Sequence, residues 1–149
     1  MTAVLLVCLG NICRSPAAEA ICRKKAEAAG LDARFDSAGT GRWHIGKKPD
    51  ARMIRAAKAR GYDLTKLRGR QVDTGDFYVY DLILGMDASN MADLAEMAPP
   101  DGTAQLKPFL AYGVGGDVPD PYHGGPSGFE RVLDMLEHAG DGLVRSLRA

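Results

Sequence analysis

The sequence lacks an apolar stretch long enough to cross a membrane, which takes about 20 consecutive apolar residues. Its one apolar run near the start, residues 3–9, has no basic region before it and no plausible cleavage site after it, so we expect no signal peptide. It also lacks net charge, because nineteen basic side chains balance nineteen acidic ones. That balance excludes a global attraction to nucleic acid or to an anionic membrane. We therefore expect a soluble cytoplasmic protein with no nucleic-acid partner and no membrane insertion.

Cysteine and histidine are scarce, with three of each. Cys8, Cys13 and Cys22 are odd in number and crowded near the N-terminus, which argues against a disulfide framework and suits a reducing compartment. The histidines have no metal-ligand spacing with one another or with the cysteines. We therefore expect no metal site.

The charges are segregated along the chain although they cancel overall. Residues 41–70 carry ten Lys or Arg against two Asp, whereas residues 72–101 carry seven acids and no base. The simplest interpretation is two oppositely charged, solvated faces.

Strand and helix signals alternate. A buried strand over residues 3–8 is followed by a tight turn and a helix from Ser15, its expected N-cap, to about Ala29. With no linker or repeat, the alternation predicts one α/β domain over residues 1–149, with a parallel sheet covered by helices on both faces. The first helix is expected to stop at Gly30. The further elements expected are strands at 34–38, 80–85 and 104–110, and helices at 49–61, at 87–98 with Asp87 as the cap, and from a Ser127 cap onward. The last helix should carry an apolar stripe at 3-4 spacing, formed by Phe129, Val132, Leu133, Leu136, Leu143 and Leu147.

The turn after the first strand has the composition of a phosphate-binding loop. Cys8 is followed by five residues and then by Arg14 and Ser15, at the carboxyl end of a strand, where such sheets bind ligands. A helix N-terminus and an adjacent cation favour the thiolate of a cysteine, which is its nucleophilic form. Gly10 and Asn11 tolerate the left-handed angles needed to wrap N–H groups around a tetrahedral dianion. Arg14 is expected at the rim of the loop, where its planar fork matches two phosphate oxygens. Ser15 can donate a hydrogen bond to the sulfur when the sulfur becomes the leaving group.

A Cys-x5-Arg spacing alone is weak evidence, because a buried strand cysteine and an ordinary surface arginine would also produce it. The strand before it and the proline-started helix after it favour a nucleophile within a phosphate-binding loop.

Residues 7–16, Val-Cys-Leu-Gly-Asn-Ile-Cys-Arg-Ser-Pro, resemble the signature of the low-molecular-weight protein tyrosine phosphatases. The likeness extends to residues 36–40, 69–72, 84–87 and 120–122. It implies a four-stranded parallel sheet in a Rossmann-like arrangement and no metal or organic cofactor. It also implies hydrolysis of protein phosphotyrosine and small aryl phosphates through a cysteinyl-phosphate intermediate. The expected partner is a phosphotyrosine-containing protein or peptide, and the expected state is a monomer or weak homodimer.

The resemblance also implies roles for single residues. Cys8 is expected to be the nucleophile, Arg14 to bind phosphate, and Asp120 to act as general acid and then base. Asp-Pro is also a common turn starter, which the sequence alone favours for Asp120. The residues expected to bind phosphate or substrate are Leu9, Gly10, Asn11, Ile12, Cys13, Ser15, Trp43 and Tyr122.

Trp43 and Tyr122 are expected to form the aromatic walls of a cleft that admits phosphotyrosine and leaves phosphoserine too short to reach the sulfur. A lone tryptophan is more often a core residue, but Trp43 lies in a polar segment at a position where the family carries a pocket aromatic.

Asn11, Ser15 and Ser37 correspond to a hydrogen-bond network that supports the family's phosphate loop. A histidine often joins this network in the family, and the resemblance places Arg68 at that position. Cys13 is either a small apolar filler or a resolving thiol that captures oxidised Cys8 as a disulfide, and the resemblance favours the second role.

Three other functions compete. A thioredoxin-coupled arsenate reductase shares the loop but needs a cysteine relay, and the chain has no cysteine after Cys22. A non-catalytic phosphopeptide-binding module needs neither a nucleophile nor an acid. A Rossmann-type nucleotide module is disfavoured because Gly-x-Gly-x-x-Gly is missing after the first strand.

Overall fold

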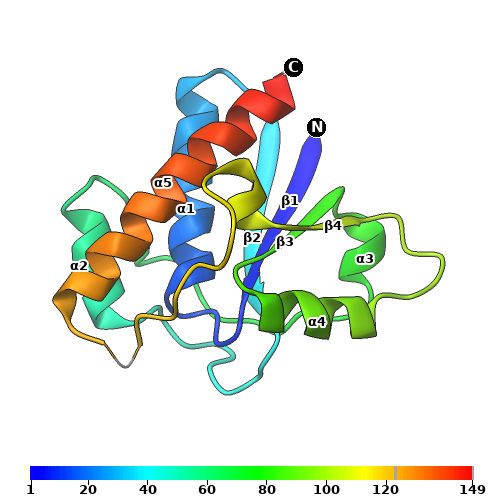
Figure 1. The fold of residues 1–149 in the computed structure, drawn as a ribbon, viewed down its shortest axis with the longest axis horizontal. Helices are drawn as coiled ribbons and strands as arrows, with labels where there is room; N and C mark the ends of the chain where they lie inside the picture. The colour runs from blue at the N-terminus through cyan, green and yellow to red at the C-terminus, as the bar shows by residue number, and fades with distance from the viewer. Residues whose placement is uncertain (123, 149) are drawn as a thin grey trace.

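The computed structural model describes residues 1–122 and 124–148. Within them, four strands form one parallel sheet in the order β2-β1-β3-β4, which confirms the predicted sheet (Figure 1). The strands are β1 (Thr2–Cys8), β2 (Ala33–Gly39), β3 (Leu82–Gly85) and β4 (Gln105–Pro108).

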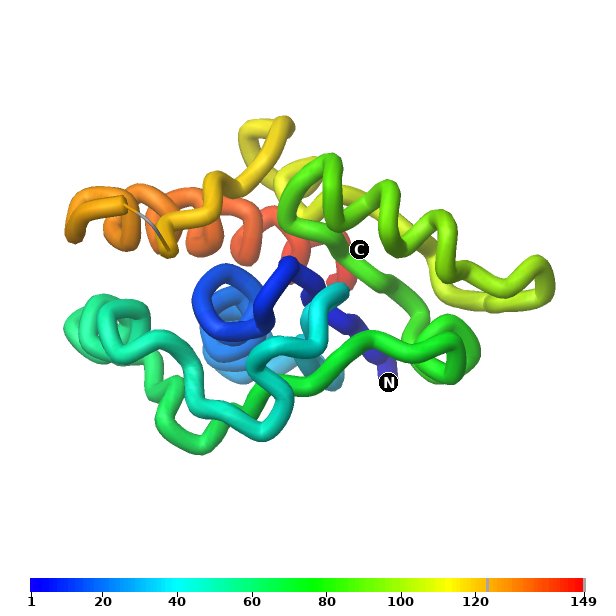
Figure 2. The backbone as a smooth tube through the Cα atoms, turned by 90° about the horizontal axis from the view of Figure 1, so that it is seen from below, coloured from blue at the N-terminus to red at the C-terminus, as the bar shows by residue number. Residues whose placement is uncertain are grey.

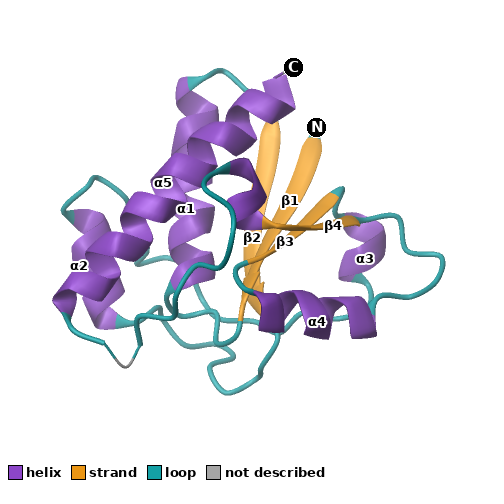
Figure 3. Cartoon of the chain, viewed as in Figure 1, coloured by secondary structure: helices purple, strands orange, loops and turns teal. Residues whose placement is uncertain are grey.

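Helices cover both faces of the sheet, also as predicted (Figure 3). Successive side chains of a strand point to opposite faces, so Val4 and Leu6 of β1 pack on one side, and Leu5 and Val7 on the other. The helices are α1 (Arg14–Ala28), α2 (Ala51–Lys58) and α5 (Pro126–Arg148) on the first face, and α3 (Asp76–Val79) and α4 (Ala88–Met97) on the second, with a 3₁₀ helix η1 (Phe109–Tyr112) after β4.

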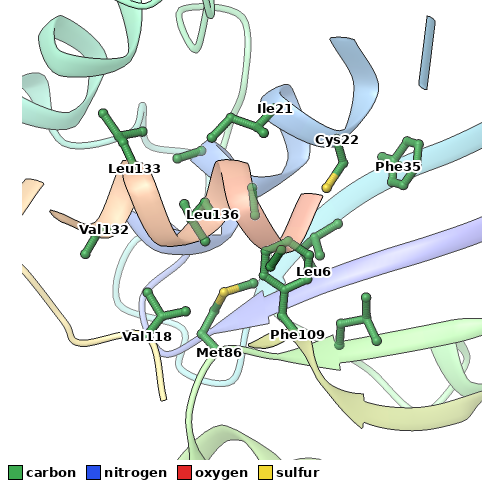
Figure 4. Close-up of a cluster of buried hydrophobic side chains, with 14 of the residues drawn as sticks. Leu6, Ile21, Cys22, Phe35, Met86, Phe109, Val118, Val132, Leu133 and Leu136 are labelled. Carbon is green, nitrogen blue, oxygen red and sulfur yellow. The ribbon is translucent and has the colours of Figure 1, made fainter. Parts of the chain in front are cut away.

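The larger core lies between the sheet, α1 and α5. Leu6 from β1 meets Ile21 of α1 and the apolar stripe of α5, which includes Val132, Leu133 and Leu136 (Figure 4). These side chains are fully buried. The stripe predicted from 3-4 spacing thus forms the contact that fixes α5 against α1.

The start of α1 differs from the prediction. The helix begins at Arg14, with Cys13 at the N-cap and no side-chain capping bond, so the expected N-cap Ser15 is wrong. Its hydroxyl is instead turned to the loop, where it meets the Cys8 sulfur. The predicted stop is confirmed, because the helix ends at Ala28 and Gly30 takes a positive φ of 67°.

Helix α5 begins at Pro126, so the expected cap Ser127 is also wrong and lies inside the helix. Gly142 lies inside α5, where the backbone carbonyl of Tyr112 comes so close that a Cβ would overlap it, so the packing requires a glycine. None of the helices in residues 1–122 and 124–148 combines the length and the apolar character needed to cross a membrane.

The sheet order places a topological switch point between β1 and β3. The connection from β1 to β2 runs through α1 on one face, whereas that from β3 to β4 runs through α4 on the other. The chain therefore leaves the carboxyl ends of β1 and β3 towards opposite faces of the sheet, and sheets of this kind bind ligands at such a point (Figure 2). Cys8 and Asp87 stand at these two ends.

Candidate active site

The loop from Cys8 to Arg14 closes tightly at the end of β1. Asn11 is the single described non-glycine residue with a positive φ, at 57°, as its residue type predicts. Gly10 does not take a positive φ. Gly39 of β2 lies against the loop so closely that a Cβ there would come within 2.7 Å of the Leu9 carbonyl.

The Cys8 sulfur is held by two donors. The sulfur lies 3.0 Å from the Ser15 hydroxyl and accepts from the Asn11 N–H at 3.3 Å. Cys8 is only 2% exposed. The amide and the hydroxyl both lie against the sulfur and fix its place in the loop.

Asn11 ties this loop to its surroundings. The NH₂ group of its side chain donates to the hydroxyls of Ser15 at 2.8 Å and Ser37 at 3.1 Å. The oxygen of the same side-chain amide accepts from the Arg70 N–H at 3.0 Å. Ser37 in turn donates to Glu19 at 2.7 Å. Ser15 accepts from Asn11, and its own proton has two acceptors within reach, the Cys8 sulfur at 3.0 Å and the Ala38 carbonyl at 3.4 Å.

The structure corrects the position proposed for Arg68. Its side chain is exposed and donates to the carbonyls of Thr65 and Leu67, away from the phosphate loop. The support from this segment comes instead from the main chain of Arg70, which no side-chain pattern indicates.

Arg14 lies buried rather than at a rim, with 2% of its surface exposed. It donates to the Asp87 carboxylate at 2.6 Å and to the Val118 carbonyl at 3.0 Å. Its other terminal nitrogen lies 3.6 Å from a carboxylate oxygen of Asp120. Burial disfavours the charged guanidinium, but the negative charges of Cys8, Asp87 and Asp120 outweigh it and raise the pKa of Arg14. The site therefore keeps a permanent cation.

Asp87 is a site residue that the sequence analysis missed. It was correctly expected to cap α4, where it accepts from the Asn90 N–H, and that role hid the second one. Its position directly after a strand that neighbours β1 is the signal that points to it.

A cleft of about 160 Å³ opens above the sulfur. Trp43 and Tyr122 stand at its mouth, 66% and 40% exposed, and the Asp120 side chain is 45% exposed. His44 also lines the cleft and was not predicted as a site residue. Thus most of the predicted residues come together, while Asn11, Ser15 and Ser37 lie behind the loop. The lining residues are Cys8, Leu9, Gly10, Ile12, Cys13, Arg14, Trp43, His44, Asp120 and Tyr122.

Cys13 lies in the same loop and is buried with a free thiol, as are Cys8 and Cys22. Burial is the main cause that raises the pKa of Cys13 far above its ordinary range, and the charges of Asp50 and Cys8 add to it. Cys13 is therefore a neutral thiol beside the candidate nucleophile.

The described part of the chain holds no group of three His, Cys, Asp or Glu residues arranged for a metal ion. Of the three histidines considered at the sequence level, His123 lies outside the described residues.

Residues 3–149 match the family described as low molecular weight phosphotyrosine protein phosphatase. The protein of that description from Schizosaccharomyces pombe is 47% identical over 150 residues, covering 97% of this chain and 96% of its own. The crystal structure of a protein tyrosine phosphatase from Entamoeba histolytica, with Hepes in its active site, superimposes with a TM-score of 0.95 at 38% identity. That match covers 99% of this chain and 97% of its own. A drosophila arginine phosphatase superimposes with a TM-score of 0.93 at 33% identity, covering 100% and 99%.

Proposed function

Because the chain belongs to the low molecular weight phosphotyrosine protein phosphatase family and is a protein tyrosine phosphatase, we propose that it acts through a phosphate ester on Cys8. The observation that carries the proposal is the meeting of three groups in one cleft: the Cys8 sulfur, the guanidinium of Arg14 and the carboxyl of Asp120. They supply a nucleophile, a fixed cation and a proton carrier, which phosphate ester cleavage requires.

Phosphate binding is the first step. The loop N–H groups between Leu9 and Ser15 and the free side of Arg14 surround the phosphate dianion, and the start of α1 adds its positive end. Asp87 holds one nitrogen of Arg14, so the guanidinium is already oriented before substrate arrives. This preorganisation lowers the cost of stabilising the transition state.

Attack by the Cys8 sulfur forms an S–P bond and breaks the bond between phosphorus and the tyrosyl oxygen. Asp120, protonated at this stage, gives its proton to the leaving oxygen, which departs as neutral tyrosine. The carboxyl stands at the mouth of the cleft, 3.6 Å from Arg14, on the side where the leaving group would exit.

Hydrolysis completes the cycle. Asp120, now ionised, takes a proton from water, whose oxygen attacks phosphorus while the S–P bond breaks. The sulfur leaves as a thiolate, and the Ser15 hydroxyl and the Asn11 N–H stabilise it. Asp120 ends the cycle protonated, ready for the next substrate.

Specificity for phosphotyrosine is proposed to come from the mouth of the cleft. Trp43 and Tyr122 offer aromatic faces to a phenyl ring, and such stacking adds about 0.5–1.5 kcal/mol beyond burial. The buried sulfur lies too deep for the short phosphoserine side chain. Phosphoarginine is the informative comparison substrate, because a drosophila arginine phosphatase shares the fold.

Cys13 is proposed as a resolving thiol. A peroxide would oxidise Cys8 to a sulfenic acid, and attack by the Cys13 sulfur would then form the disulfide and release water. Its place in the same loop as Cys8 and its free thiol support this role, and because its pKa is raised, the Cys13 sulfur must give up its proton as the disulfide forms. A cytoplasmic location fits the three free cysteines, and we propose a monomer or weak homodimer that acts on phosphotyrosine-containing proteins.

The test is hydrolysis of p-nitrophenyl phosphate at mildly acidic pH with EDTA present, comparing the wild type with Cys8→Ser. We expect turnover by the wild type and none by the variant, with a phosphoenzyme trapped on the wild type alone. Turnover that survives Cys8→Ser, or that EDTA abolishes, contradicts the mechanism. Phosphotyrosyl, phosphoseryl and phosphoarginyl peptides then rank the substrates.

A further inference from the structure

Arg52 lies outside the cleft, near the start of α2, and its side chain is bound on two sides. Towards its own helix, it grips the Asp50 carboxylate with two nitrogens, at 3.1 and 2.9 Å. Asp50 is also the N-cap of α2, accepting from the Arg52 N–H at 2.8 Å. The guanidinium is therefore held in one orientation by a planar, two-point contact.

Arg52 also binds Tyr122, which belongs to the loop that carries Asp120 (residues 118–122, here called the acid loop). One terminal nitrogen donates to the Tyr122 carbonyl at 2.8 Å. The guanidinium also stands over two aromatic rings, with its central carbon 5.5 Å from the ring centre of Tyr122 and 4.9 Å from that of Phe129. A lysine would reproduce the charge but neither the fork nor the flat stacking surface.

The two residues that Arg52 binds, Asp50 and Tyr122, are each hydrogen-bonded to a part of the candidate active site. Asp50 donates its N–H to the Ile12 carbonyl of the phosphate loop at 2.8 Å. Tyr122 donates its N–H to the Asp120 carboxylate at 3.0 Å. A continuous series of hydrogen bonds thus joins the phosphate loop to the acid through Arg52.

The acid loop is anchored on both sides of Asp120, and Arg52 provides the anchor on the C-terminal side. Before Asp120, the chain is anchored at Val118, which donates to the Met86 carbonyl at 2.8 Å and accepts from Arg14 at 3.0 Å. After Asp120, glycines follow at 124 and 125, and the Arg52 contact with Tyr122 ties the chain back to α2. Two arginines therefore hold the loop, one on each side of the acid.

We infer that Arg52 is a positioning residue that sets the place of the Asp120 carboxyl above the phosphate loop and so governs proton delivery to the leaving group. This inference rests on the general-acid role proposed for Asp120. The ion pair between Arg52 and Asp50 is partly exposed and adds little to stability. We therefore expect replacement of Arg52 to change the catalytic rate more than the stability.

The test uses two substrates that differ in their need for a proton. The nitro group of p-nitrophenyl phosphate stabilises the leaving phenolate, whereas phenyl phosphate depends on the acid. The measured quantity is kcat/KM, which reports the steps up to cleavage of the P–O bond. Four proteins are compared: the wild type, Asp120→Asn as the reference for a lost acid, Arg52→Gln, and Arg55→Gln. Arg55 is an exposed arginine one turn further along α2. Both arginines line a groove between α2 and the start of α5, so Arg55 controls for lost charge.

For Asp120→Asn we expect a loss of roughly 10²–10⁴ on phenyl phosphate and a smaller one on the nitrophenyl ester. For Arg52→Gln we expect roughly a 10-fold loss on phenyl phosphate and less than about 3-fold on the nitrophenyl ester, since small misplacements carry large costs in rate. Arg52→Lys should lie between the wild type and Arg52→Gln, and Arg55→Gln should match the wild type.

The possible failures are separable. If Asp120→Asn loses equally on both substrates, the acid role of Asp120 fails, and the inference about Arg52 with it. A second outcome is that Asp120→Asn loses more kcat/KM on phenyl phosphate than on the nitrophenyl ester, while Arg52→Gln lowers kcat/KM equally for both substrates or for neither. In that case Arg52 does not position the acid. Circular dichroism melting of each variant excludes an unfolded fraction as the cause.

Discussion

At the residue scale, Arg14 is placed between two carboxylates that differ in distance and in exposure. Asp87 contacts it at 2.6 Å with a 22% exposed side chain, while Asp120 stands 3.6 Å away and is 45% exposed. The nearer, better buried carboxylate is suited to fix the guanidinium. In the mechanism proposed above, the farther one exchanges a proton with substrate and water. That mechanism thus gives orientation to one acid and proton transfer to the other.

Replacing Asp87 tests this division. Asp87→Ala releases one nitrogen of Arg14, so we expect kcat/KM for p-nitrophenyl phosphate to fall roughly 10- to 100-fold through misplacement of the guanidinium. The matched control is Asn90→Ala, which removes the other half of the α4 cap but does not contact Arg14. Both variants should lose about 1 kcal/mol of stability. Equal rates in the two variants would show that Asp87 acts only as a cap.

Ser15 provides a second test at this scale. Ser15→Ala removes the hydroxyl donor to the Cys8 sulfur, so the thiolate leaves the phosphoenzyme less readily. We expect hydrolysis of the intermediate to slow roughly 10-fold, the value of one hydrogen bond to a charged group. Rapid-mixing kinetics should then show a burst of nitrophenol followed by slow turnover. Ser37→Ala, one hydrogen bond further from the sulfur, should give a smaller change. A slowed burst with unchanged steady turnover would contradict this role.

At the scale of elements, the end of β2 and the start of α2 both brace the phosphate loop. The Thr40 N–H, just past β2, donates to the Cys8 carbonyl, and the Asp50 N–H at the α2 cap donates to the Ile12 carbonyl. The Asp50 carboxyl also has a lowered pKa, chiefly because the Arg52 side chain binds its ionised form. The cap of α2 therefore has a dependence on pH.

Because the pKa of Asp50 is lower in the folded protein than in the unfolded chain, its contribution is complete above the unfolded pKa. It is lost as the pH falls through the folded pKa. Asp50→Ala should cost about 1 kcal/mol at neutral pH, and less at pH ~3. Asp50→Asn keeps a capping side chain, so it should retain more stability at neutral pH with less dependence on acid. Urea unfolding at the two pH values measures both. A constant difference between wild type and Asp50→Ala would exclude the carboxylate as the cause.

The sequence indicated the longer elements and the phosphate loop because their signals are local. Strand β1, Gly30 and the α5 stripe follow from residue types within one segment. The failures involve competition or distance. Serine is a residue type that often caps helices, but the hydroxyl of Ser15 contacts the Cys8 sulfur instead of a helix N–H. Asp87 meets Arg14 only after β3 pairs with β1, and the Arg70 amide is a backbone group that no side-chain pattern marks. Helix α3 is too short to show a period.

At the scale of the whole molecule, a cluster of charges joins α5 to the chain that follows α2. Arg60 binds three acids of α5, and Tyr62 donates to one of them, Glu137, at 2.7 Å. This cluster lies away from the residues that line the cleft. The three acids bound by Arg60 are Glu130, Asp134 and Glu137.

Arg60→Ala should therefore affect stability and leave catalysis unchanged. Three partly exposed ion pairs predict a loss of about 1–2 kcal/mol, which lowers Tm by roughly 2–8 °C for a chain of this size. Calorimetry and kcat/KM are measured on the same samples. The control is Arg145→Ala, an exposed arginine near the end of α5. A fall in kcat/KM at a temperature where the variant is folded would contradict the separation of roles.

The two charged segments also occupy different sides of the molecule. Residues 41–70, with their excess of bases, run past the cleft and supply Trp43 and His44 to its mouth, whereas the acidic residues 72–101 form the opposite flank (Figure 2). We expect this separation of charge to give the molecule an electric dipole, with the excess of bases nearer the entrance, although its net charge is zero. An approaching phosphoprotein would be turned towards the cleft before contact, and dissolved salt would weaken that torque. Encounter rates should therefore fall with ionic strength even at the isoelectric point.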